Sequence, residues 1–539
     1  MPLLQLVSTI IIGISASWLR MFIALALSIA FSLVVGISAA TNKSLERVIL
    51  PTLDVLQTIP ILGFFPVVIY LVVLFLPNFV GINIAVIFLI FTSMSWNIAF
   101  GVYEAVKSIP SELVEAARLS GFSKAKMFTS IYAPASLPRI AYQSTISWSI
   151  GLFYLVTSEI FSTGSKAFAV KYGIGVEVAK IALSHNIIAY ITLIVLFVIA
   201  VVLTRIFFLK PLSLFSEKYS FKEEFNTRNR SAVLSFYSKV NALVSPGFRK
   251  FSLLLIESIP RAKAKKNAVF EHAKEKHFGR RRIRHYIKLA TEITLILFSS
   301  ITLLLLIKIG FFANITIVLL ALFASFARVW FTYLICVAVA VPLGITIGLS
   351  KKAYEPALST LQVISAIPAT LLLPAIVALM FFLPYSGEMV ALSVIFLAMV
   401  WYLLFSIISG MRTIPAQVFE VKEMLGLKRL QAWKNIYLPA IMPAFITGSI
   451  TAIGGAWNAL IVAEYFTISA INGSASNSTV LTQVGTGIGK LIDQSVFQGN
   501  LELTLVAIFS MTVMVIGINR LVWQRLYNKY TSRIRGVLQ

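Results

Sequence analysis

The sequence predicts an all-α, polytopic membrane protein made of two fused copies of one helical module. Three observations predict this fold class: the composition, the recurrence of long apolar stretches and an internal repeat. The 539 residues are 58% hydrophobic and 12% charged, with a mean hydropathy of +0.89. Soluble domains carry about 25% charged residues. One water-soluble core could not bury this much apolar surface, so most of it must face lipid or other helices within lipid.

Apolar stretches long enough to cross a bilayer, which takes roughly 20 residues, recur along the whole chain. We expect about 11 transmembrane helices, five in a first module and six in a second. They are placed near 16–39, 59–79, 83–101, 139–161, 187–209, 288–309, 325–349, 366–384, 389–409, 443–465 and 501–524.

Charge divides the chain into a first module (1–210), a basic linker (211–287) and a second module (288–539). From Lys210 to Lys288 there are 19 Lys/Arg and 6 Asp/Glu, which places the linker in the cytoplasm under the positive-inside rule. An odd number of spans then puts the N-terminus outside and the basic C-terminus inside. Membrane lipids are the expected partner of the linker; nucleic acid is not, because no groove-reading motif accompanies the charge.

Two further expectations concern processing and covalent chemistry. Residues 1–19 hold no charge, so no removable signal peptide is expected. Cys336 is the only cysteine, which excludes a disulfide within the chain and a thiolate metal site.

Residues that rarely align by chance recur at offsets of 305 to 308 residues. The matched pairs are Arg20/Arg328, Gly36/Gly344, Pro60/Pro368, Pro66/Pro374, Trp96/Trp401, Pro110/Pro415, Glu115/Glu420, Gly121/Gly426 and Glu159/Glu464. Both copies enter the membrane in the same orientation. This parallel repeat predicts a pseudo-two-fold axis along the membrane normal, with the transport path between the halves.

The stretch 109–121 predicts a short helix on the cytoplasmic face. Ser111 can cap it, and Glu115 lies near its positive end. Ala116 and Ala117 are small and allow another surface to approach. Gly121 suits the left-handed residue that ends such a helix.

A second short helix is expected over 124–131, stopped before the membrane by Pro134 and Pro138. The two helices together would form a helix-turn-helix finger.

The finger resembles the EAA loop of permeases from binding-protein-dependent ABC importers. The resemblance is carried by Glu115-Ala116-Ala117, Gly121, Ile131 and Leu137-Pro138. The second copy keeps Glu420, Gly426, Ile436, Leu438 and Pro439, but has Val421 and Lys422 in place of the two alanines. The resemblance implies two fused type I permease modules. It also implies that Glu115, Ala116, Ala117, Gly121, Glu420 and Gly426 belong to loops that dock on ATP-binding subunits.

Val156-Thr157-Ser158-Glu159 and Val462-Ala463-Glu464, each followed by a Gly-Ile-Gly, resemble the nitrate, sulfonate and taurine branch of this family. The resemblance implies inward transport of a small anion across a prokaryotic plasma membrane. Its implied partners are two ABC ATP-binding subunits and an extracytoplasmic solute-binding protein. No permease homodimer is required, because one chain supplies both halves.

We expect no enzymatic activity and no bound cofactor in this chain. The nearest approach to a phosphate loop, at 485–490, lacks the required glycine spacing and the Ser/Thr after Lys. ATP and Mg²⁺ would therefore bind to partner subunits.

Candidate pathway or gating residues are those that are costly in an apolar span. Glu159 and Glu464 lie near the outer ends of matching spans. They either face the path or reach interfacial water and brace the outer loop, capping the Gly-Ile-Gly helix. Pro66 and Pro374, like Pro60 and Pro368, mark bends beside the path or plain helix starts. Trp457 and Asn458 lie mid-span, and packing is favoured over a pathway contact.

The sequence also suggests three alternative functions. Fused ABC permeases for ferric iron share the loop features. A secondary transporter driven by an ion gradient would need central carboxylates or broken helices, and both candidate acids lie near a span end. A signalling protein with the basic linker as its output lacks any catalytic constellation.

Overall fold

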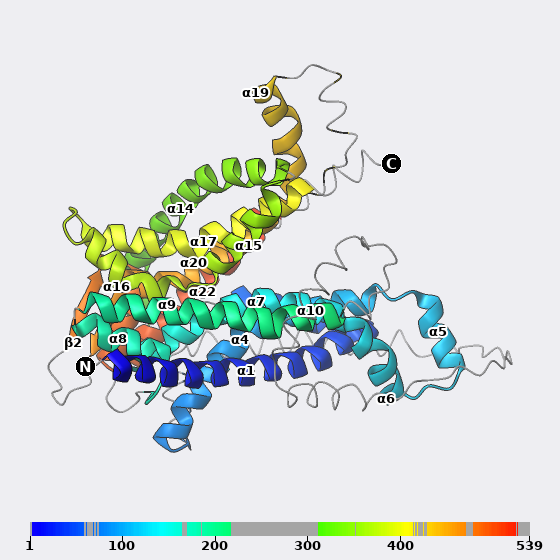
Figure 1. Ribbon diagram of the computed structural model, residues 1–539, viewed down its shortest axis with the longest axis horizontal. Helices are drawn as coiled ribbons and strands as arrows, with labels where there is room; N and C mark the ends of the chain where they lie inside the picture. The colour runs from blue at the N-terminus through cyan, green and yellow to red at the C-terminus, as the bar shows by residue number, and fades with distance from the viewer. Residues whose placement is uncertain are drawn as a thin grey trace.

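The computed structural model describes most of both halves of the chain (Figure 1). The described residues are 3–58, 75–163, 170–184, 186–216, 311–350, 352–412, 428–469 and 478–523, with the isolated positions Ile61, Val68, Val72, Ile414, Val418, Met424, Arg525 and Leu526. Most of the expected span at 59–79, the whole of the span at 288–309, nearly all of the linker and the end of the C-terminal tail lie outside these residues.

The first half consists of helices, two of which carry a wider π-helical turn. Its elements are α1 (Leu3–Thr41), α2 (Lys43–Thr58), α4 (Asn78–Lys107), α5 (Ser111–Leu119), α6 (Lys124–Met127), η1 (Phe128–Tyr132), α7 (Ala133–Thr163), α8 (Ile174–Ser184), α9 (Ile187–Thr204), η2 (Arg205–Leu209) and α10 (Lys210–Ser216).

The second half repeats this order and adds one antiparallel hairpin. Its elements are α14 (Phe311–Leu349), α15 (Tyr354–Ser365), α16 (Ala369–Met380), α17 (Ser386–Arg412), α19 (Arg429–Ala432), η4 (Trp433–Tyr437), α20 (Leu438–Glu464), β1 (Tyr465–Ser469), β2 (Ser478–Gln483), α21 (Ile488–Phe497), α22 (Leu501–Ile518) and η5 (Asn519–Trp523). The hairpin falls in the loop that is 9 residues longer than its first-half counterpart.

Within the described residues, seven helices are long and apolar enough to cross a membrane, and one bent pair brings the number to eight. The bent pair is α15 and α16, which meet at 81° around Pro368. The candidate span near 366–384 begins at this break, as expected if Pro368 marks a bend or a helix start. The residue before a proline disfavours the helical conformation, so the chain breaks there and restarts at Ala369. Pro374 lies inside α16.

Each half packs its helices in the same sequence. In the first half α1 packs on α4, and α4 packs on α7; in the second half α14 packs on α17, and α17 packs on α20. The repeated glycines explain the close crossings. A Cβ atom at Gly36 would lie 2.8 Å from the Ala99 carbonyl oxygen, and one at Gly344 would lie 2.6 Å from the Ile407 Cγ2. These two α-helical crossings need glycine.

The amphipathic helix α2 is fastened to the end of α4 by its one early carboxylate. The Tyr103 hydroxyl donates to Glu46 Oε1 at 2.6 Å, and Lys107 Nζ donates to Oε2 at 2.9 Å. These two donors hold the pKa of Glu46 below its usual value, the tyrosine having the larger effect. The contact fixes the turn at which the chain leaves α1.

The two halves exchange contacts in a pattern that fits a pseudo-two-fold relation. Helix α2 of the first half packs on α22 of the second, and α15 of the second half packs on α9 of the first. Helix α16 also contacts α7 and α8. Figure 1 shows α8 and β2 near the start of α1, with α5 and α6 at the opposite end of the molecule.

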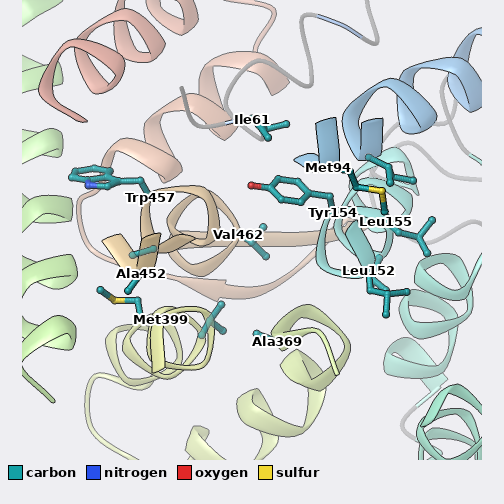
Figure 2. Close-up of a cluster of buried hydrophobic side chains, with 14 of the residues drawn as sticks. Ile61, Met94, Leu152, Tyr154, Leu155, Ala369, Met399, Ala452, Trp457 and Val462 are labelled. Carbon is teal, nitrogen blue, oxygen red and sulfur yellow. The ribbon is translucent and has the colours of Figure 1, made fainter. Parts of the chain in front are cut away.

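An apolar cluster joins the halves behind these contacts. Figure 2 shows side chains of α7 and α20 in this cluster, with the Tyr154 ring extending from α7 toward α20. Leu152 and Trp457 are among the largest fully buried side chains, and Tyr154 is 5% exposed. The core therefore continues from one half into the other.

We expect Gly36→Ala to destabilise the protein by about 1–3 kcal/mol, because the added methyl would meet a backbone carbonyl that cannot move aside. Gly344→Ala should cost a similar amount, since the added methyl would lie 2.9 Å from the Ile407 Cβ, which side-chain rotation cannot move. Gly454 in α20 is the matched control, because a Cβ there meets nothing within 4 Å. Thermal unfolding of the purified variants measures the order; a Gly36→Ala protein as stable as Gly454→Ala would contradict it.

Candidate functional site

The first finger ends in a glycine-dependent turn, as the sequence predicted. Gly121 has φ +72°. The Gly121 amide donates to the Arg118 carbonyl at 3.0 Å, and the Phe122 amide donates to the Ala117 carbonyl at 3.1 Å. This is the Schellman arrangement, which requires a left-handed residue at its turn. The predicted helix stop at Gly121 is confirmed.

The start of α5 differs from the prediction. Pro110 is the N-cap residue and Ser111 is the first helical residue, without a capping hydrogen bond from its side chain. The prediction that Ser111 caps the helix is wrong, because Pro110 already sets the extended conformation that precedes a helix. Glu115 and Ala116 are exposed, whereas Ala117 is 8% exposed and packs on the core.

The second helix of the finger does not stop before the membrane. Helix α6 is capped by Ser123, whose hydroxyl accepts from the Lys126 amide. It then passes through η1, where the Ala133 amide donates to the Phe128 carbonyl, and continues as α7. The prediction that Pro134 and Pro138 end the helix is wrong. The wider π turn absorbs one extra residue and lets the helix continue.

The second finger repeats the same junction at η4, where the Leu438 amide donates to the Trp433 carbonyl. Helix α19 precedes it. Glu420 and Gly426, the second-half counterparts of Glu115 and Gly121, lie outside the described residues, as does the first-half Pro66.

Glu159 is fully buried at the end of α7 and lies at the centre of a polar network. Ser17 donates to Glu159 Oε1 at 2.7 Å, and Arg20 Nη1 donates to the same atom at 2.6 Å. The Gly175 amide donates to Oε2 at 2.9 Å, and the Ile174 amide donates to the Ser17 hydroxyl at 2.9 Å. The carboxylate and the hydroxyl therefore cap the N-terminus of α8 from other helices.

Glu464 repeats this network in the second half. Ser325 donates to Glu464 Oε1 at 2.5 Å, and Arg328 Nη1 donates to it at 2.8 Å. The Gly489 amide donates to Oε2 at 2.7 Å, and the Ile488 amide donates to Ser325 at 2.8 Å. We call these two groups the outer polar networks. They hold α8 and α21 in equivalent places.

One position differs between the outer polar networks. Arg20 Nε donates to the Asn83 side-chain oxygen at 2.8 Å, whereas Arg328 donates from Nε and Nη2 to Glu388 at 2.6 and 2.7 Å. Asn83 and Glu388 are repeat partners at an offset of 305. Arg20 thus faces one carboxylate, and Arg328 faces two.

The buried Glu159 and Glu464 side chains are each 0% exposed, so the expectation that they reach interfacial water is wrong. The expectation that they cap the Gly-Ile-Gly helices describes the geometry correctly. A charged pair in an apolar surrounding needs additional hydrogen bonds to offset its desolvation, and both networks supply them. A pathway or gating role for either residue stays a prediction.

Asn458 is 8% exposed and links the two halves. Its Oδ1 accepts from the Ile61 amide of the first half at 2.7 Å, and its Nδ2 donates to the Gly454 carbonyl at 2.9 Å. The neighbouring Trp457 is 1% exposed in the core, and among the described residues its Nε1 has no hydrogen-bond partner. These two adjacent residues therefore differ: one makes an inter-half hydrogen bond and the other packs.

Sequence reasoning missed the partners of the two acids. Arg20 and Arg328 were used only as markers of the repeat, and Ser17, Ser325 and Glu388 were not singled out. A usable signal existed, because a lone Arg and a lone Glu in apolar spans recur together in both copies.

Within the described residues, no group of three or more His, Cys, Asp or Glu side chains could hold a metal ion.

The sequence profile of a family described as "Binding-protein-dependent transport system inner membrane component" matches the chain twice, over residues 32–210 and 340–533. The chain belongs to this family. It is a multi-pass membrane permease built from two fused modules, and it is not itself an enzyme. The predicted recognition as a permease of a binding-protein-dependent importer is confirmed.

Curated relatives resemble parts of this permease. The nitrate import permease protein NrtB of Synechocystis sp. is 29% identical over 32% of this chain and 64% of the relative. The bicarbonate transport system permease protein CmpB of Synechocystis sp. is 32% identical over 26% of this chain and 49% of the relative. ProW of Escherichia coli, a glycine betaine/proline betaine permease, is 27% identical over 32% and 49%. The chain therefore spans about half to two thirds of these relatives.

We expect Glu159→Gln to destabilise the permease by roughly 3–5 kcal/mol, because it leaves the buried Arg20 charge without a carboxylate. Glu464→Gln should cost less, since Arg328 keeps Glu388. Asn83→Ala, which removes one hydrogen-bond acceptor, is the control, expected to cost about 1–2 kcal/mol. Thermal unfolding in detergent gives the order of the three variants, and equal losses for the two glutamine variants would contradict it.

Proposed function

We propose that this permease forms the complete transmembrane pathway of an ATP-driven importer for a small anion. The observation that carries the proposal is the finger: a short helix ended sharply by Gly121, present in a chain whose family acts with a binding protein. An exposed Glu115 and Ala116 on α5 suit a surface that docks into a partner's groove. Two fingers in one chain would serve two ATP-binding subunits, so a second permease chain is unnecessary.

The substrate class is supported by the names of the relatives. Relatives named for nitrate and bicarbonate support a small oxyanion, with sulfonates and taurine as related candidates. Acidic residues near a path would repel an anion. In this permease Glu159 and Glu464 are buried and each is paired with an arginine. Arg20 balances the charge of Glu159, whereas Arg328 is shared by Glu464 and Glu388, so the pairing reduces the repulsion fully in the first half and partly in the second.

Reconstitution in vesicles with the ATP-binding subunits and the binding protein tests the proposal. ATP-dependent uptake of nitrate or bicarbonate is the expected result, and glycine betaine and ferric iron are the comparison substrates. Uptake by the purified chain alone, driven by a proton or sodium gradient, would overturn the proposal in favour of a secondary transporter.

We further propose that the fingers, linker and C-terminus are cytoplasmic, and that the N-terminus, α8 and β2 are outside. In Figure 1 the first finger lies at the end of the molecule away from α8 and β2. This agrees with the basic charge of the linker.

Labelling of single cysteines in intact cells tests this orientation. In a Cys336→Ala background, an impermeant maleimide should label Gln5→Cys but leave Lys265→Cys unlabelled until the membrane is permeabilised. Labelling of position 265 in intact cells would reverse the assignment.

We expect Gly121→Val to abolish ATP-dependent uptake while leaving membrane insertion intact. A Cβ at Gly121 meets nothing within 4 Å, so the whole effect comes from the backbone: roughly 1–2 kcal/mol for a left-handed residue with a side chain. The chain after α5 would then leave the helix in a different direction, which would change the orientation of the finger. Gly121→Asn is the matched control, because asparagine tolerates this conformation and should retain most of the uptake.

Capture of the ATP-binding subunits by the purified permease gives a second measurement on the fingers. Glu115→Lys should reduce capture more than Glu420→Lys, since the first finger matches the family motif better. Full uptake by Gly121→Val would contradict the role assigned to the finger.

A further inference from the structure

Each half turns at the same place after its first long helix, and we call the helices after the turns, α2 and α15, the elbow helices. The turn residues Asn42 and Ser350 are repeat partners at an offset of 308. Asn42 Oδ1 accepts a hydrogen bond from the Ser44 amide at 2.9 Å. The Ser350 hydroxyl accepts one from the Ala353 amide at 3.1 Å. Both turns are therefore held by a side-chain acceptor at the same position of the repeat.

In the first half, an ion pair fastens the elbow helix to the end of α4. Lys107 Nζ donates to Glu46 Oε2 at 2.9 Å, and the Tyr103 hydroxyl donates to Oε1 at 2.6 Å. Lys107 is the last residue of α4, and α5 begins at Ser111. The ion pair therefore joins the elbow helix to the base of the first finger.

In the second half, the same two positions hold a cation–π pair. The guanidinium carbon of Arg412 lies 3.9 Å from the centroid of the Tyr354 ring. Tyr354 is the repeat partner of Glu46 at an offset of 308, and Arg412 is that of Lys107 at 305. A guanidinium within about 6 Å of an aromatic face is attracted by the ring. Arg412 is the last residue of α17, so the attachment recurs at the end of the equivalent helix.

The chemistry of the attachment has changed between the halves, but the attraction has not. Both members of the pair differ, and each combination still joins a cation to a group that attracts it. The neighbouring contact is not shared, because the repeat partner of Tyr103 is Ile408, whose side chain cannot donate a hydrogen bond. The feature common to both halves is therefore the pair itself. We call Glu46–Lys107 and Tyr354–Arg412 the elbow pairs.

Each elbow helix also packs on a helix of the opposite half. Helix α2 packs on α22, and α15 packs on α9. The second of these contacts is reinforced where η2 continues α9, because Arg205 Nη2 donates a hydrogen bond to Gln362 Oε1 of α15. A hydrogen bond with an ionised donor is roughly twice as strong as a neutral one. Each elbow helix is thus attached on two sides, to the end of a long helix in its own half and to a helix of the other half.

We propose that the elbow pairs are the joints through which movement of each finger reaches the opposite half. This inference rests on the proposed function. When an ATP-binding subunit moves a finger, the elbow pair makes the elbow helix follow, and the elbow helix carries α22 or α9 of the other half with it. The four residues of the elbow pairs are positioning residues that act through α2 and α15.

Transport per ATP hydrolysed tests the proposal. The complete transporter carrying Glu46→Leu or Tyr354→Leu is reconstituted in vesicles with its ATP-binding subunits and binding protein, and uptake of nitrate and bicarbonate is divided by ATP hydrolysis. Each variant should capture the ATP-binding subunits normally but lose about fivefold in this ratio, the size expected for one partly exposed charged contact. Arg47→Gln, which removes an exposed charge from α2, is the control and should leave the ratio unchanged.

Two further variants distinguish a joint from a merely structural contact. Tyr354→Phe keeps the ring beside Arg412 and should retain the native ratio. Glu46→Tyr combined with Lys107→Arg places the second-half pair in the first half, and should recover most of what Glu46→Leu loses. An exchanged pair that transports as poorly per ATP as Glu46→Leu would overturn the joint. Native ratios in both leucine variants would also overturn it.

A distance measurement decides the matter if the leucine variants fail to assemble. Spin labels at Arg47→Cys in α2 and at Ser130→Cys in the finger, in a Cys336→Ala background, report whether these two elements move together. Both native side chains are exposed. The distance distribution between the labels should be the same with and without ATP, because the joint makes α2 follow the finger. A distribution that changes with ATP would refute the joint.

These outcomes separate the joint from the proposed function. Absence of ATP-dependent anion uptake by the transporter with native elbow pairs contradicts the function itself. Native uptake together with unchanged ratios in the leucine variants contradicts the joint alone.

Discussion

The buried pairing of Arg20 with Glu159, repeated by Arg328 with Glu464, is the interaction on which the outer end of each half depends. A carboxylate at 0% exposure is tolerable only with a cation and further donors around it. Here the remaining donors are the first amides of α8 and α21, together with one serine hydroxyl. The ion pair therefore does two things at once: it neutralises a buried charge, and it fixes the start of a short helix.

Contacts within each half differ in kind from contacts between the halves. Among the described residues, the ion pairs and the glycine crossings, such as Gly36 against Ala99, lie within a half. Apolar side chains and hydrogen bonds join the halves, and one of these bonds has a charged donor, Arg205, which bonds to Gln362. Because water is absent from the bilayer, apolar contacts between helices gain little over contacts with lipid, so close packing and hydrogen bonds hold the helices together.

Much of the fold could be predicted because its signals are local or repeated. The helix end at Gly121 could be predicted because it needs a single left-handed residue. The duplication could be predicted because rare residues recur at offsets of 305 to 308. The Arg–Glu pairs could not be assigned with the same ease, since Arg20 and Glu159 are 139 positions apart and meet only after three helices pack. The π turns left no sequence signal, because one extra residue in a helix looks like ordinary helical sequence. The break before Ala369 was indicated by Pro368, but its 81° bend was not.

The difference between Asn83 and Glu388 shows what fusion allows. A permease assembled from two identical chains must place the same residue at both positions, so both arginines would face one carboxylate or both would face two. In the fused chain the two equivalent positions are encoded separately. Arg20 therefore bonds to the side-chain amide of Asn83, while Arg328 bonds to a second carboxylate, that of Glu388. With Glu464 and Glu388 both ionised, the second network carries one net negative charge, whereas the first is neutral. The same freedom places Asn458, which bonds to the Ile61 amide of the other half, where the first copy has Phe153, so the two halves need not make the same contacts with each other.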